Sequence, residues 1–185
     1  MEIENNNFLY MRKAEFLQRG LNKLIEYVNS FQNTKELNMI EIGSYLGEST
    51  ITFSKNFKSV ISIDPFIEDY DPNDATCYHA PLNKVFDQFK KNISEISNIY
   101  HIRETSDDAF YKLPKQQYFL VYIDGLHTYE QVKKDIANYR KLIPAGGFIC
   151  GHDYSTNWQG VKDAIDEAFG SPDMIFEDTS WIKRI

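Results

Sequence analysis

The sequence has 185 residues, which is the size of a single domain. Its 20 Lys and Arg residues are outnumbered by 27 Asp and Glu residues, and this net charge of −7 argues against nucleic acid or an anionic membrane as a partner. No apolar run approaches the ~20 residues of a membrane span, and the first residues lack the pattern of a signal peptide. Two cysteines are too few for a disulfide framework. We therefore expect one cytoplasmic domain over 1–185.

The first half of the chain alternates helical and strand patterns. Apolar spacing predicts, in chain order, a helix over 17–28, a strand over 39–42, a helix after Gly47, a strand over 60–63 and a helix over 82–96. We expect residues 1–36 to form an N-terminal helical cap. The polar, irregular stretch 66–80 predicts a long loop, and because loops of this length are often functional, we expect it to cover a ligand.

The second half continues the alternation. Its predicted elements are a strand over 99–102, a short helix from Ser106, a strand over 118–123, a helix after the capping box at Thr128, a strand over 148–150, a helix over 161–168 and strands over 174–176 and 181–182. Repeated strand–helix units predict parallel strands joined by right-handed crossovers. Apolar runs without alternation indicate that helices cover both faces of the sheet. The predicted fold is therefore a doubly wound α/β sandwich.

Polar residues follow the carboxyl end of each of the first five predicted strands. They are Gly43–Gly47, Asp64, Ser106–Asp107, Asp124–His127 and Gly151–Asp153. Each group alone has an ordinary structural explanation as a turn or a helix cap. Ligands of doubly wound sheets bind at the carboxyl ends of the strands, so five such groups together indicate a ligand site.

The first strand leads into a turn that contains Gly43 and Gly47. Glycines let the backbone approach a ligand closely, and the following helix offers free N–H groups. The spacing is not Gly-x-Gly-x-x-Gly, which disfavours an NAD-dependent enzyme. Asp64, about twenty residues further on, suits the two hydroxyls of a ribose. A nucleoside cofactor without a pyrophosphate explains both features, and a tight turn followed by a capping Asp is the structural alternative.

Three motifs carry a resemblance to a known family. EIGSYLGES at 41–49 resembles the first motif of class I S-adenosylmethionine-dependent methyltransferases, especially the catechol O-methyltransferase type. DGLHTY at 124–129 and GHDY at 151–154 are similar to a bacterial branch of small-molecule and sugar O-methyltransferases that includes the macrocin type, although Ala145 is inserted before the glycine pair. The resemblance covers 37–170. It implies a Rossmann-like, doubly wound, mostly parallel seven-stranded sheet with an antiparallel C-terminal strand.

The resemblance also implies roles for individual residues in binding S-adenosylmethionine. The methionine part of the cofactor would contact the glycine turn, and an acidic residue before the turn would shape it. The ribose and the adenine would bind after the second and third strands. The residues implied in cofactor binding are Glu41, Gly43, Ser44, Gly47, Ser49, Asp64, Ser106, Asp107 and Asp124.

A divalent metal is implied at Asp124, His152 and Asp153, and a catalytic base at His127. A metal lowers the pKa of an acceptor hydroxyl, and a base then removes its proton. Mg and Mn are the metals considered, but the family usually has a carboxylate where this chain has His152, and an imidazole favours Mn, Fe, Ni or Zn over Mg. A metal-free site, with both histidines bonded to the acceptor, remains open. His127 also has a structural interpretation as the residue before a helix cap.

We therefore expect an S-adenosylmethionine-dependent O-methyltransferase that acts on a hydroxyl of a small molecule or sugar, with Asp124 and His127 as catalytic residues. The segments 1–36 and 66–80 would cover the acceptor. A catalytically degenerate binding protein with the methyltransferase fold and a hydroxylase-like relative are the alternatives. Whether the chain forms a homo-oligomer remains open, since related enzymes often associate.

Overall fold

The computed structural model describes residues 15–71, 74, 76–115 and 117–185. Its centre is one seven-stranded sheet with the strand order β3-β2-β1-β4-β5-β7-β6. The strands are β1 Asn38–Ile42, β2 Ser59–Ile63, β3 Ile99–Ile102, β4 Leu120–Ile123, β5 Phe148–Gly151, β6 Met174–Ile175 and β7 Trp181–Arg184. Strands β1 to β5 run parallel, and β7 is antiparallel to both β5 and β6. The predicted fold is confirmed, including the antiparallel C-terminal edge.

The helices alternate with the strands as the sequence predicts. They are α1 Glu15–Asn29, α2 Glu48–Ser54, α3 Thr76–His79, α4 Leu82–Ile93, α5 Ser106–Phe110, α6 Tyr129–Tyr139 and α7 Gln159–Phe169, with short 3-10 helices at Thr34–Glu36, Arg140–Leu142 and Thr156–Trp158. The predicted helix over 82–96 ends at Ile93, three residues early. The predicted loop over 66–80 contains the short helix α3. None of the described helices has the length and apolarity needed to cross a bilayer.

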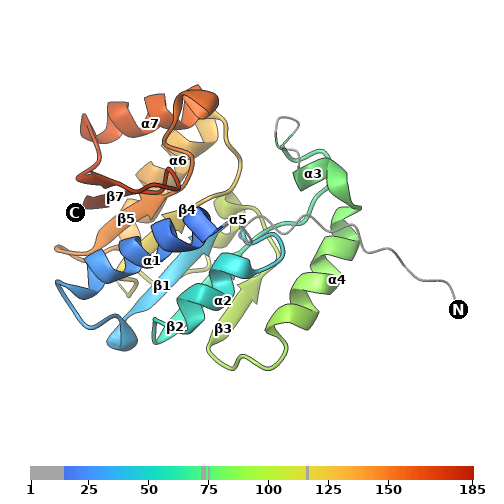
Figure 1. Cartoon of the computed structure of the whole chain (residues 1–185). Coiled ribbons are helices and arrows are strands. Elements are labelled where there is room, and N and C mark those ends of the chain that lie inside the picture. The colour runs from blue at the N-terminus through green and yellow to red at the C-terminus, as the bar shows by residue number, and fades with distance from the viewer. Residues whose placement is uncertain (1–14, 72–73, 75, 116) are drawn as a thin grey trace, which may run out of the picture.

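Helices cover both faces of the sheet, and each face has its own apolar core (Figure 1). Side chains alternate between the two faces along a strand, so neighbouring residues of β1 belong to different cores. Met39 packs with residues of α1 and α2, whereas Ile40 packs with residues of α5, α6 and α7. Helix α4 packs through Val85 and Phe89 against Leu46, which follows β1. Both faces are therefore buried, as the apolar runs indicate.

Two segments of the chain were predicted to cover the site, and the structure describes each in part. Residues 1–14 of the N-terminal segment lie outside the described residues, whereas α1 packs on the sheet and Leu17 near its start lines a cavity. Residues 72–73 and 75 of the loop also lie outside the described residues. The described part of that loop reaches the same cavity, as detailed below.

Candidate functional site

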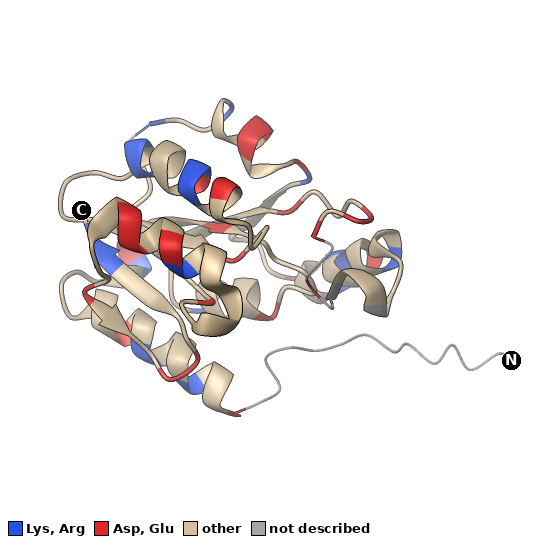
Figure 2. Ribbon diagram, turned by 90° about the horizontal axis from the view of Figure 1, so that it is seen from above, with Lys and Arg blue, Asp and Glu red and all other residues tan. Residues whose placement is uncertain are grey.

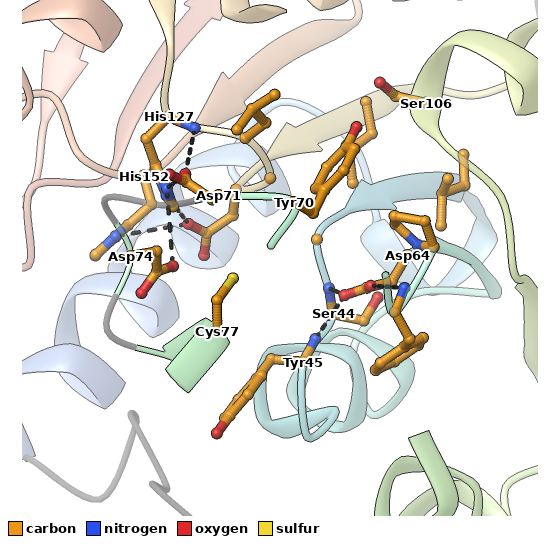
Figure 3. Close-up of a pocket in the computed structure, with 18 of the residues that line it drawn as sticks. Ser44, Tyr45, Asp64, Tyr70, Asp71, Asp74, Cys77, Ser106, His127 and His152 are labelled. Atoms are coloured by element: carbon orange, nitrogen blue, oxygen red, sulfur yellow. Dashed lines mark hydrogen bonds and ion pairs between the residues drawn. The ribbon is translucent and has the colours of Figure 1, made fainter. Parts of the chain in front are cut away.

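A cavity of about 250 Å³ opens where the parallel strands end. Its walls include the residues that follow β1, β2, β3, β4 and β5, together with part of the loop after β2. Figure 3 shows two groups of polar side chains on opposite sides of it. We call the group that contains Ser44, Tyr45 and Asp64 the glycine-turn end, and the group that contains Asp71, Asp74, Asp124, His127, His152 and Asp153 the carboxylate end.

The glycine turn after β1 has a backbone shape that requires glycine. Gly43 has a φ of +85°, and a Cβ atom there would lie 1.8 Å from the carbonyl oxygen of Asp124. Its amide donates to the carbonyl of Ile63 at 2.8 Å, which ties the turn to the end of β2. Gly47 has a φ of +81° and caps the N-terminus of α2. Both glycines therefore meet a conformational need that other residues would satisfy only with strain.

Asp64 binds the glycine turn through backbone amides. Its Oδ2 accepts from the amides of Ser44 at 2.9 Å and Tyr45 at 3.0 Å, and its Oδ1 accepts from the amide of Phe66 at 3.0 Å. Burial raises the pKa of Asp64, while these three hydrogen bonds oppose the rise. A carboxylate has about four acceptor positions, so one remains for a ligand hydroxyl. Asp64 lines the cavity, and its role toward a ribose stays a prediction.

Glu41 lies beneath the glycine turn rather than in the wall of the cavity. Its side chain is fully buried, and its Oε2 accepts hydrogen bonds from the hydroxyls of Thr50 in α2 and Ser44 in the turn. The glutamate therefore links the turn to the first turn of the next helix. This position agrees with a role in shaping the turn and not with direct contact to a ligand.

The remaining residues that were predicted to bind the cofactor differ in whether they line the cavity. Ser49 and Ser106 are buried and line the cavity. Asp107 is not among the lining residues, and its carboxylate pairs with Lys134 of α6 at 2.6 Å. Of the two predicted residues Ser106 and Asp107, Ser106 is therefore the one that is placed to contact a ligand.

Two residues near Ser106 were not predicted. Gln131 of α6 donates from Nε2 to Ser106 Oγ and to Asp135 Oδ1, both at 3.1 Å. Asp135 is 1% exposed, and burial raises its pKa to about 7 although hydrogen bonds from Ser106 and Gln131 oppose the rise. The sequence does contain a signal, because Asp135 interrupts the apolar stripe of α6 between Val132 and Ile136. An acid in such a stripe needs polar partners inside the protein.

Asp124, His152 and Asp153 come together as predicted. One ligand atom from each lies within 4.8 Å of the others, because Asp124 follows β4 and the other two follow the neighbouring strand β5. His152 Nδ1 lies 3.1 Å from Asp153 Oδ1 and 3.8 Å from Asp124 Oδ1. Asp153 has a φ of +62°, a strained conformation for a residue other than glycine. One imidazole and two carboxylates fit a divalent cation such as Mn.

His127 lies among four carboxylates at the same end of the cavity. Its backbone amide and Nδ1 both contact Asp71 Oδ2, at 3.0 and 2.9 Å, and Nε2 lies 3.0 Å from Asp153 Oδ2. Asp74 and Asp124 are each 3.8 Å from one of the ring nitrogens. Burial alone would lower the pKa of His127, but hydrogen bonds to Asp124, Asp153 and Asp71 raise it well above its usual value. The described arrangement therefore favours the imidazolium form.

The carboxylate end has three further features that bear on its charge and shape. Burial acts to raise the pKa of Asp153, but hydrogen bonds from His127 and His152 more than offset it and hold that pKa well below its usual range. The ring of Trp158 packs on His127 with centroids 4.4 Å apart. Asp71 is buried although it belongs to the polar loop after β2. Sequence reasoning missed Asp71 and Trp158, because neither belongs to a strand-end motif.

The family model of the methyltransferase domain matches residues 40–154, which is more than half of the chain. The chain therefore belongs to this family of methyltransferase domains. A curated relative, the uncharacterized protein R132 of Acanthamoeba polyphaga mimivirus, is 33% identical over 134 residues, covering 68% of this chain and 55% of the relative. The chain thus spans about half the length of that relative.

Solved structures with the same fold include methyltransferases. The O-methyltransferase NovP superposes with a TM-score of 0.68 at 17% identity, covering 91% of this chain and 79% of NovP. The N-methyltransferase NodS from Bradyrhizobium japonicum WM9, determined with S-adenosyl-L-homocysteine, gives a TM-score of 0.63 at 14% identity, covering 97% of this chain and 90% of NodS. At these identities the likeness concerns the fold. Together with the family match, it confirms the predicted class, an S-adenosylmethionine-dependent methyltransferase fold with O-methyltransferase neighbours.

Proposed function

We propose that the protein is an S-adenosylmethionine-dependent O-methyltransferase, a single domain over 1–185 that acts on a hydroxyl of a small molecule or sugar. The observation that carries the proposal is the shared cavity. The glycine-turn end and the carboxylate end line one space of about 250 Å³. A methyl donor at the first end would therefore face an acceptor at the second, and holding both reactants at attack distance is a large part of such catalysis.

At the glycine-turn end, this chain's own groups would bind the cofactor. Gly43, Ser44 and Ser49 would contact the methionine part, Asp64 the ribose hydroxyls and Ser106 the adenine. The positive sulfonium and ammonium groups of the cofactor suit a cavity whose walls carry several carboxylates. The complex of the neighbour NodS with S-adenosyl-L-homocysteine supports this choice of cofactor.

At the carboxylate end, Asp124, His152 and Asp153 would hold a divalent metal, Mn or Mg. When bound, such a metal lowers the pKa of an acceptor hydroxyl and fixes its direction. Hard carboxylate oxygens suit either ion, and the imidazole of His152 favours Mn. His152 is also tied to the end of β4, since its amide donates to the carbonyl of Ile123 at 3.1 Å.

We assign proton transfer to Nε2 of His127. The contact of Nδ1 with Asp71 fixes the ring and directs Nε2 toward Asp124 and Asp153. A hydroxyl bound beside these two carboxylates would therefore lie next to Nε2. The ring accepts a proton only when it is neutral, and the neutral form is favoured when these carboxylates bind a cation in place of the imidazolium.

The charge of the cavity narrows the choice of acceptor. The described residues that line it include Asp71, Asp74, Asp124 and Asp153 at the carboxylate end and contain no Lys or Arg. Figure 2 likewise shows Asp and Glu segments on the loops near the centre of the view. An anionic acceptor would meet these four carboxylates, whose negative charge the one imidazolium of His127 offsets only in part. We therefore propose a neutral or positively charged acceptor, and not a coenzyme A thioester or a phosphorylated sugar.

The test is the release of S-adenosylhomocysteine with a panel of neutral, cationic and anionic hydroxyl compounds, with added Mn or with chelator. The proposal expects turnover with hydroxyl compounds that bear no negative charge and a methyl ether as product. Binding of the cofactor without turnover of any acceptor would favour the degenerate binding protein. An oxygenated product without S-adenosylhomocysteine would favour the hydroxylase-like relative. A methylated amine would assign the nitrogen chemistry of NodS instead.

A further inference from the structure

A row of polar residues crosses the sheet beneath the glycine turn. Glu41 of β1 pairs in register with Ser62 of β2, and Ser62 pairs with His101 of β3. Residues in register on neighbouring parallel strands point to the same face, so these three side chains lie next to one another. Glu41 and Ser62 are fully buried. The proposed chemistry uses Glu41 only to shape the turn and uses neither Ser62 nor His101.

Hydrogen bonds join this row to the glycine turn. His101 Nδ1 lies 3.1 Å from Ser62 Oγ, and Ser62 Oγ lies 2.6 Å from Ser44 Oγ. Ser44 Oγ in turn lies 3.4 Å from Glu41 Oε2. Because the Ser44 amide is bonded to Asp64, this residue of the turn is held by its backbone on one side and by its hydroxyl on the other.

Two hydrogen-bond orders satisfy these contacts, because a serine hydroxyl has one proton to donate. In the first order, His101 Nδ1–H donates to Ser62, Ser62 donates to Ser44, and Ser44 donates to Glu41. In the second order, Ser44 donates to Ser62 and Ser62 donates to His101 Nδ1, which places the proton of the neutral ring on Nε2.

The surroundings of His101 favour the first order. Its Nε2 is buried and has no hydrogen-bond partner among the described residues, so an N–H at this position would be a donor without an acceptor. The ring packs against Phe89, Phe66 and Phe86 with centroid distances of 4.7, 5.6 and 5.6 Å. Desolvation lowers the pKa of His101 to about 4, and Arg103 adds to the shift while a hydrogen bond with the Ser62 backbone opposes it. The ring is therefore neutral at ordinary pH.

We propose that His101 and Ser62 are positioning residues for the methyl donor. His101 Nδ1–H donates to Ser62, Ser62 to Ser44 and Ser44 to Glu41, and this relay holds the Gly43–Gly47 turn in the shape that receives the cofactor. The inference rests on the proposed function, because it assigns the turn to S-adenosylmethionine. It adds two residues outside the cavity wall to those that determine cofactor affinity.

The first test is the tautomer of His101 in the ligand-free protein, measured by nitrogen-15 NMR of the histidine rings. The His101→Asn variant assigns the signal. The relay requires a proton on Nδ1 and none on Nε2. A proton on Nε2 would reverse the required hydrogen-bond order and overturn the relay, whatever the protein binds.

The second test is calorimetric binding of S-adenosylhomocysteine by matched variants. Ser62→Ala and His101→Leu remove a donor, and we expect each to weaken binding about tenfold, since each leaves a buried polar partner unsatisfied. His101→Asn keeps an N–H donor near the Nδ1 position and should bind within about twofold of the native protein. Ser59→Ala is the control, because Ser59 lies on the same strand but donates to Asn38 at 2.8 Å, away from the turn.

The outcomes separate this inference from the proposed function. Native affinity in Ser62→Ala, with or without a loss of thermal stability, would show a merely structural role and overturn the proposal. If the native protein binds no S-adenosylhomocysteine, the proposed function fails and the positioning role fails with it. If Ser62→Ala does not fold, two other results test the proposal. They are the difference in S-adenosylhomocysteine affinity between His101→Leu and His101→Asn, and the tautomer of His101.

Discussion

The two ends of the cavity are built in different ways. At the glycine-turn end, Asp64 accepts hydrogen bonds from three backbone amides, and the hydroxyls of Ser44 and Thr50 donate to Glu41 Oε2. At the carboxylate end, charged side chains from the loop after β2 and from the ends of β4 and β5 meet around His127. The first end is a network of fixed dipoles, and the second is a concentration of like charges around one ring.

Because of this difference, we expect the two ends of the cavity to respond differently when a ligand binds. Dipoles held by hydrogen bonds require little reorganisation when a ligand arrives. Four carboxylates near one imidazole repel one another, so a bound cation would relieve the repulsion. We therefore expect the glycine-turn end to bind cofactor in the absence of metal, and the carboxylate end to depend on a cation. Variants at the two ends should therefore differ in which quantity they change.

The largest effect is expected for the group of Asp124, His152 and Asp153. Asp153→Asn should lower kcat/KM about 10³-fold or more, because it removes a ligand from the proposed metal site. Affinity for S-adenosylhomocysteine, measured by calorimetry, should stay near the native value. Glu167→Gln is the matched control, since it alters an exposed pair with Lys133 and should change neither quantity. Full activity of the native protein after extensive chelation would contradict the metal assignment.

A glycine pair tests the turn itself. Gly43→Ala and Gly170→Ala both place a side chain at positive φ, +85° and +73°, but only the first would push a Cβ into the Asp124 carbonyl. We expect Gly43→Ala to cost about 3 kcal/mol or more in unfolding free energy. Gly170→Ala should cost about 1 kcal/mol. Chemical denaturation measures the unfolding free energy of both variants. Equal losses would mean that the nearby Asp124 carbonyl does not restrict residue 43.

His127 should affect the chemical step and not cofactor binding. His127→Gln removes the nitrogen assigned to proton transfer, so kcat should fall about 10²-fold. Calorimetry should show S-adenosylhomocysteine affinity within about threefold of native, which is about 0.7 kcal/mol. An equal loss of kcat and of S-adenosylhomocysteine affinity would mean that His127 also supports cofactor binding at the other end of the cavity.

The anchor of His127 should have a smaller effect. Asp71→Asn keeps an acceptor for the ring but removes its charge, so kcat should fall about tenfold, as expected for loss of a hydrogen bond to a charged group. Asp69→Asn, in the same loop but exposed, should leave kcat unchanged. Equal rates in the two variants would show that the loop does not position the histidine.

A further prediction concerns the pH dependence of stability through Asp135. Burial raises the pKa of Asp135 to about 7 in the folded protein. Between pH 4 and 7 the folded state therefore holds a proton that the unfolded state has lost, so this group makes stability fall as pH rises, by about 1 kcal/mol per pH unit. Asp135→Asn should remove this contribution. Parallel stability curves for the two proteins would contradict the shifted pKa.

The fold could be predicted from the sequence because its signals are local. Apolar runs and helical spacing identify the strands and helices, and glycines at positions 43 and 47 identify the turn. Neighbouring parallel strands bring their carboxyl ends together, so the meeting of Asp124, His152 and Asp153 follows from the topology. These three residues belong to motifs directly after β4 and β5, where the pattern is strong.

The unpredicted parts of the site depend on contacts between distant segments. Asp71 lies in a polar loop whose sequence gives no sign that it reaches His127, 56 residues later. The relay from His101 depends on the register of three strands, which the sequence does not specify. Asp107 was expected in the site, but the structure places it outside the cavity wall, paired with Lys134.

Calorimetric titration of the native protein with S-adenosylhomocysteine and with NAD, each with added Mn and with chelator, tests the proposed function most directly. We expect binding of S-adenosylhomocysteine in the micromolar range under both conditions and no binding of NAD. We also expect a separate heat for Mn that is lost in Asp153→Asn. Absence of S-adenosylhomocysteine binding under every condition would contradict the proposed function and favour a methyltransferase fold that no longer binds its cofactor.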